Sequence, residues 1–121
     1  MDGYSSARRA YTESSILTAP PERLVVMLYD GAIRFLTQAV HAQRAGNASR
    51  FRESLRRGEA IIAELNRTLD MSQGEVAERL RAIYMFCKRH LIEAQLQFDP
   101  TRIERVIELL SELRESWEAI A

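Results

Sequence analysis

The stretch that decides the fold reads Leu-Val-Val-Met-Leu-Tyr at residues 24–29. It follows Thr18-Ala19-Pro20-Pro21-Glu22-Arg23, a strong signal for the start of a helix because proline suits the first helical position. Six consecutive apolar residues cover about 600° of rotation, so this helix is apolar around its whole circumference. A helix in a small bundle buries only one stripe. We therefore expect an N-terminal arm, a copy of the chain or a partner to cover the remaining face.

Signals for helix ends divide the rest of the chain. Gly46 ends one helix and Asn47 is suited to cap the next. Ser72 and Glu75 have the spacing of a capping box. Asp99 stands directly before a proline at the start of a fourth helix. The predicted helices span residues 21–45, 48–70, 73–98 and 100–120.

Each of these segments carries apolar residues at helical spacing, and no window alternates as a strand does. Short connections between long helices favour antiparallel neighbours. The sequence therefore predicts an all-α fold, an antiparallel up-down-up-down four-helix bundle at residues 21–121. Residues 1–20 are predicted to form an N-terminal arm, because a short segment of this kind is marginal as an isolated helix.

The composition is that of a globular protein: 121 residues, 46% hydrophobic and 28% charged, with a formal net charge of zero. This balance gives no general attraction to nucleic acid or anionic lipid, and the arginines at residues 44–57 lack the aromatic ladder of a nucleic-acid site. No apolar run is long enough to span a membrane. The first residues lack a signal-peptide pattern, so we expect a cytoplasmic protein.

Catalytic and metal sites are not indicated, and no cofactor is expected. A di-metal centre in a bundle needs Glu-x-x-His motifs, whereas His90 and Glu93 occur once in the reverse order. Cys87 falls on a core stripe without an activating base. An alternative function is a histidine phosphorelay bundle that uses His90, flanked by Lys88 and Arg89. A self-associating structural bundle is a further alternative.

Apolar side chains in excess of the core are the strongest functional signal. We expect Leu24 and Leu28 to face the core, and Val25, Met27 and Tyr29 to face outward. Ile33 on the first helix, and Tyr84, Met85 and Phe86 on the third, widen the apolar surface further. Four or five such side chains left in water would expose on the order of 400 Å², about 10 kcal/mol at 25 cal/mol per Å². A patch of this size on a monomer usually marks an interaction site.

The sequence resembles the FliS family of flagellin-specific export chaperones over nearly its whole length. The likeness is most specific in the Met-Leu-Tyr-Asp-Gly-Ala piece at residues 27–32. The matching residues are Ala10-Tyr11, Glu13-Ser14, Thr18-Ala19-Pro20, residues 24–32, Leu65-Asn66, Leu69-Asp70-Met71, Gly74-Glu75-Val76-Ala77, Leu80, Ile83-Tyr84, Arg89-His90-Leu91, Ala94, Leu109-Leu110, Leu113-Arg114 and Trp117.

This resemblance implies a non-enzymatic cytoplasmic chaperone. Its client would be the disordered C-terminal segment of flagellin, kept from polymerising and delivered to the type III export apparatus. Other flagellar regulators are possible further partners. The arm, with Tyr4 and Tyr11, would either cover the client groove of its own chain or swap onto a second copy in a homodimer. The expected groove residues are Tyr11, Ile16, Leu17, Val25, Met27, Tyr29, Ile33 and Tyr84.

Overall fold

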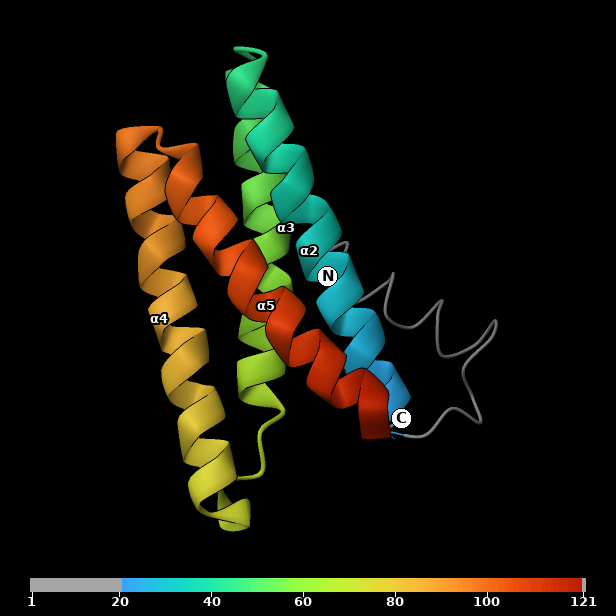
Figure 1. Ribbon diagram of the computed structural model, residues 1–121. Helices are drawn as coiled ribbons and strands as arrows, with labels where there is room; N and C mark the ends of the chain where they lie inside the picture. The colour runs from blue at the N-terminus through green and yellow to red at the C-terminus, as the bar shows by residue number, and fades with distance from the viewer. Residues whose placement is uncertain (1–20, 121) are drawn as a thin grey trace, which may run out of the picture.

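The computed structural model describes residues 21–120, apart from the side chains of Gln73 and Ile120. Four long helices run in alternating directions along the chain (Figure 1), which confirms the predicted all-α up-down-up-down bundle. The elements are α2 (Pro21–Arg44), α3 (Ala48–Arg67), the short 3-10 helix η1 (Met71–Gln73), α4 (Glu75–Gln97) and α5 (Pro100–Ile120). The arm predicted at residues 1–20 lies outside the described residues.

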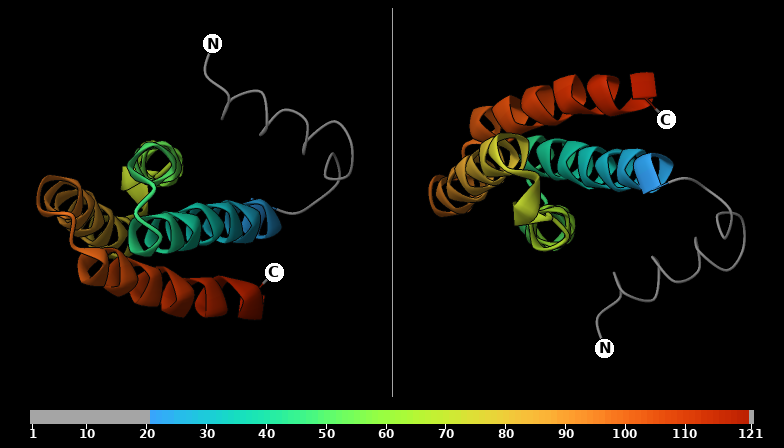
Figure 2. Two further views of the ribbon diagram at one scale, coloured as in Figure 1. Left: turned by 90° about the horizontal axis from the view of Figure 1, so that it is seen from above. Right: turned by 90° about the horizontal axis from the view of Figure 1, so that it is seen from below.

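The helices form a ring in which each packs against two neighbours. α2 contacts α3 and α5, and α4 contacts the same two helices from the other side. α2 and α4 therefore lie diagonally opposite, as the end-on views show (Figure 2). Side chains from all four helices meet in the centre. The largest fully buried ones are Tyr29, Phe51, Leu36, Leu55, Leu91, Ile103, Leu110, Val26, Val106 and Cys87.

The connection between α2 and α3 follows the predicted signals. Gly46 has a φ of 74°, a backbone conformation that glycine adopts without a steric penalty. The N–H groups of Gly46 and Asn47 donate to the carbonyls of Gln43 and Ala42, the two bonds of a Schellman motif. The Asn47 side chain then accepts from the Arg50 N–H at 3.0 Å and caps α3. Asp99 caps the start of α5 in a similar way, accepting from the Thr101 N–H.

The connection between α3 and α4 differs from the prediction. α3 ends at Arg67 rather than at residue 70, and α4 begins at Glu75 rather than at residue 73. The predicted capping box of Ser72 and Glu75 does not form. Instead, Asp70 accepts both the Ser72 N–H and the Ser72 hydroxyl, at 3.0 and 2.6 Å. Gly74, with a φ of 71°, stands at the N-cap of α4, so Ser72 lies two residues before the position from which a side chain could cap that helix. Asp70 caps η1 instead.

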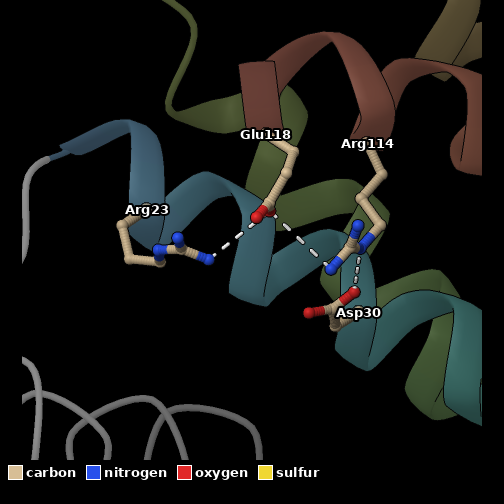
Figure 3. Close-up of polar contacts among 4 residues, drawn as sticks. All are labelled: Arg23, Asp30, Arg114 and Glu118. Atoms are coloured by element: carbon tan, nitrogen blue, oxygen red, sulfur yellow. Dashed lines mark hydrogen bonds and ion pairs between the residues drawn. The ribbon is translucent and has the colours of Figure 1, made fainter. Parts of the chain in front are cut away.

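The seam between α2 and α5 is closed by ion pairs near the start of α2 (Figure 3). Arg114 binds Asp30, and it also lies 3.7 Å from Glu118. Glu118 in turn lies 3.4 Å from Arg23. All four side chains are partly exposed, so each pair contributes little free energy by itself. Their alternation across the seam fixes how the two helices lie against each other at this end.

At Gly58, α2 and α3 approach closely. A Cβ atom at this position would lie 2.6 Å from Cδ2 of Leu36. Glycine in a helix costs about 1 kcal/mol relative to alanine, so its presence here indicates that the close approach matters to the packing. Among residues 21–120, no helix is sufficiently long and apolar to cross a lipid bilayer.

Candidate functional site

An open groove follows the seam between α3 and α4. α4 makes less extensive contacts with its neighbours than α2 does, and two hollows remain along its side. We call them the upper and lower hollows, in the orientation of Figure 1, and together the α3–α4 groove. Their volumes are about 400 and 370 Å³. Tyr84 lines both hollows, so they adjoin at its side chain.

The lower hollow is apolar and lies where α3 ends and α4 begins. Side chains from every helix contribute to it: Val25, Leu65, Leu69, Val76, Ala77, Leu80, Tyr84 and Trp117. Val76 is 66% exposed on its rim, and Met71 in the neighbouring η1 is 42% exposed. Val25 lies in the second turn of α2, so α2 begins close to this hollow.

A hydrogen-bonded pair of tyrosines lies beneath the lower hollow. The hydroxyls of Tyr29 on α2 and Tyr84 on α4 are 2.5 Å apart and span the diagonal of the bundle. Burial raises the pKa of both tyrosines above the ordinary value of 10.0, although Trp117 of α5 favours the charged form of Tyr29 and offsets part of the rise in its pKa. The two phenols therefore stay neutral and serve as a polar brace rather than as acids or bases.

The upper hollow has an apolar floor and polar walls. Ile62, Ala63, Met85 and Leu91 supply the floor. Five polar or charged side chains complete the lining: Arg56, Glu59, Asn66, Arg67 and Lys88. Burial raises the pKa of the Glu59 carboxyl above 4.5, and the positive charge of Lys88 opposes part of that rise.

No reaction centre accompanies the groove in the part of the chain that the structure describes. Within residues 21–120, no group of three or more His, Cys, Asp or Glu side chains could hold a metal ion. Cys87 is fully buried, and burial raises the pKa of its thiol to about 11, so it is a poor nucleophile. The His90 ring lies 4.1 Å from the ring of Phe86, centroid to centroid, and is half-buried. The groove is suited to binding an apolar segment.

Two of the expected site residues line this groove, namely Val25 and Tyr84. Tyr29 does not face outward as expected. It is fully buried, because the inward stripe of α2 runs through Val26 and Tyr29 rather than through Leu24 and Leu28, which are only half-buried. Contact with both α3 and α5 widens this inward face and takes in the tyrosine.

The remaining expected residues lie elsewhere. Met27 and Ile33 are half-buried on α2 and do not line the groove. Tyr4, Tyr11, Ile16 and Leu17 fall outside the described residues. Sequence reasoning missed Leu69, Leu80 and Trp117 as groove residues because their helical spacing equally fits a core stripe. One sequence signal could have indicated the groove: the apolar residues of α4 are not confined to a single face. In the structure, Val76, Ile92 and Leu96 on this helix are exposed.

The described residues form an all-α helical bundle with an open apolar groove along one seam. The family model described as "Flagellar protein FliS" matches residues 4–121, and the chain therefore belongs to the FliS family. The chain is 33% identical over 121 residues to the flagellar secretion chaperone FliS of Salmonella typhimurium, covering 98% of this chain and 90% of the relative. The FliS of Bacillus subtilis is 31% identical over 109 residues, covering 90% and 81%, and that of Campylobacter jejuni is 33% identical over 115 residues, covering 94% and 90%.

Proposed function

We propose that this protein is a flagellar secretion chaperone that binds the disordered C-terminal segment of flagellin. By holding that segment it keeps flagellin from polymerising in the cytoplasm, and it aids delivery to the type III export apparatus. The observation that carries the proposal is the α3–α4 groove, which leaves apolar side chains open along one seam of the bundle. The membership of the FliS family and the printed names of the relatives support it.

The chemistry of the groove suits a client that folds as it binds. An amphipathic helix laid into an apolar groove is a common mode of peptide recognition. A disordered segment can wrap a large surface in this way, although ordering it reduces the affinity gained per unit of area. Met27 and Ile33 on α2 are proposed to extend the contact beyond the groove, since both are half-buried apolar side chains outside it.

This function can be tested by isothermal titration calorimetry, which measures the affinity for a peptide. The peptide spans the C-terminal segment of the flagellin encoded in the same genome. Val76→Glu places a charge on the rim of the lower hollow, where the side chain is 66% exposed. Leu96→Glu is the matched control, because Leu96 is 76% exposed on the same helix and does not line either hollow. We expect Val76→Glu to weaken binding at least tenfold and Leu96→Glu to bind as the unaltered chain does. Equal affinities for the two variants would refute the groove.

We further propose that the N-terminal arm covers the lower hollow in the free chaperone. The support is the position of Val25, which lines this hollow in the second turn of α2, so that α2 begins close to it. A tethered segment acts at an effective concentration on the order of millimolar, so it shields the groove but yields to a tighter client. Deleting residues 1–17 should tighten peptide binding and increase the fluorescence of a dye that binds apolar surface. A deletion that changes neither quantity would argue against the cover, and sedimentation of the full chain would detect a swapped dimer.

A further inference from the structure

Two buried oxygen atoms on the wall of the upper hollow have no hydrogen-bond partner among the described residues. They are Oε1 of Glu59 and Oδ1 of Asn66. Both side chains line the upper hollow from α3. Leaving such an acceptor unpaired is costly, and nearly all buried polar atoms in folded proteins are paired. The two oxygens are seven residues apart on one helix, which places them about 10.5 Å apart along its axis at 1.5 Å per residue.

The charges around these oxygens favour an uncharged donor. Lys88 faces Glu59, Arg56 is paired with Glu53, and Arg67 is paired with Glu64. Carboxylates therefore already engage each of the three cations that line the hollow, and Lys88 already acts on Glu59, so the lining offers no unopposed partner to a charged group of a ligand. A carboxamide carries two N–H donors and no net charge, so it pairs with either oxygen without needing such a partner.

The floor of the hollow favours a helical ligand over an extended one. An extended segment crossing the distance between the two oxygens would bring about three residues, each with a backbone N–H and C=O, over the apolar floor. Two acceptors cannot satisfy that many groups. A helix pairs its backbone groups internally and presents only side chains. On such a helix, side chains seven residues apart match the spacing of the two oxygens.

We infer that the client enters the upper hollow as an amphipathic helix whose two Asn or Gln side chains, seven residues apart, donate to Oε1 of Glu59 and Oδ1 of Asn66. This inference rests on the proposed function and names the part of the client that the groove selects. Glu59 and Asn66 act as specificity-determining residues, whereas the apolar floor supplies the affinity. The client supplies donors to two oxygens with which no described residue pairs.

A double-mutant cycle by calorimetry tests the pairing. Each Asn or Gln of the flagellin C-terminal peptide is replaced in turn by Leu or Met, and each peptide is titrated into the unaltered chaperone, Glu59→Met and Asn66→Leu. We expect one carboxamide whose removal weakens binding about tenfold to the unaltered chaperone but leaves binding to Glu59→Met unchanged. A second carboxamide, seven residues away, should couple to Asn66 in the same way. Glu112→Met, at an exposed position on α5, is the control and should couple to neither.

Thermal unfolding of Glu59→Met and Asn66→Leu shows whether the variants fold, and we expect both to be at least as stable as the unaltered chain because each loses an unpaired buried acceptor. Coupling of Glu59 to a lysine or arginine of the peptide would overturn this inference and leave the proposed function intact. The same holds if no carboxamide couples while Val76→Glu still weakens binding at least tenfold. Absence of binding to the unaltered chaperone would overturn both.

Discussion

The tyrosine pair beneath the lower hollow gives a sharp prediction about stability. Tyr29→Phe removes the hydroxyl that hydrogen-bonds with Tyr84 at 2.5 Å. Tyr84 is only 2% exposed, so its own hydroxyl then loses its partner in a site that water scarcely reaches. An unpaired buried polar group costs about 1–3 kcal/mol. We therefore expect the free energy of unfolding to fall by about 2 kcal/mol in Tyr29→Phe.

The partner variant should behave differently. Tyr84→Phe leaves the Tyr29 hydroxyl under the favourable influence of Trp117, so the expected loss is smaller, about 1 kcal/mol. In the double variant no hydroxyl remains to be paired across the diagonal. Its loss should fall short of the sum of the single losses by at least about 0.5 kcal/mol, the coupling typical of groups in contact.

Urea unfolding followed by far-ultraviolet circular dichroism measures all four chains. The midpoint should shift while the slope of the free energy against urea stays the same, because the change acts on the folded state. A loss within about 0.5 kcal/mol for Tyr29→Phe, the range of ordinary surface substitutions, would refute the reasoning. A larger loss in Tyr84→Phe than in Tyr29→Phe would refute it as well.

Two further predictions concern α3. Gly58→Ala should lower the free energy of unfolding by about 1 kcal/mol, because overpacking against Leu36 outweighs the helix propensity of alanine; a urea midpoint that rises instead would contradict the close approach. Burial raises the pKa of Glu59 above 4.5, so its stabilising contribution is complete below pH 4.5 and is lost as the pH rises through the higher folded value. The stability of Glu59→Gln relative to the unaltered chain should therefore grow between acidic and neutral pH in urea titrations, and a difference independent of pH would contradict the burial of this carboxyl.

Local features of the fold were predictable because their causes lie within a few residues. Gly46 ends α2 through its own backbone conformation, and Asn47 caps α3 through its own side chain. Asp99 does the same for α5. The capping box at Ser72 does not form because residues 71–73 fold into η1, which Asp70 caps, and Gly74 takes the N-cap of α4. Both arrangements satisfy the local spacing, so the sequence does not decide between them.

The orientation of Tyr29 could not be predicted from the apolar run that contains it. In a helix that is apolar on every side, the sequence pattern does not indicate which face is buried. That face is set by contacts with helices that are distant in sequence. Tyr84 is 55 residues away along the chain, and the bond between the two hydroxyls exists only because α2 and α4 face each other across the bundle. The α3–α4 groove was missed for the same reason. Leu69 and Leu80 follow helical spacing whether they fill a core or line a groove, and only the packing of α4 decides between the two.

The position of the client on the bundle is the central claim, and methyl nuclear magnetic resonance measures it most directly. Titrating the flagellin C-terminal peptide into methyl-labelled chaperone should shift the signals of Leu65, Leu69, Val76 and Leu80, which line the lower hollow. Leu96 is exposed on α4, as Val76 is, but it lies outside the groove, so the signals of its methyl groups should not shift. Shifts confined to α2, with the four groove residues unchanged, would contradict the assignment of the client to the α3–α4 groove.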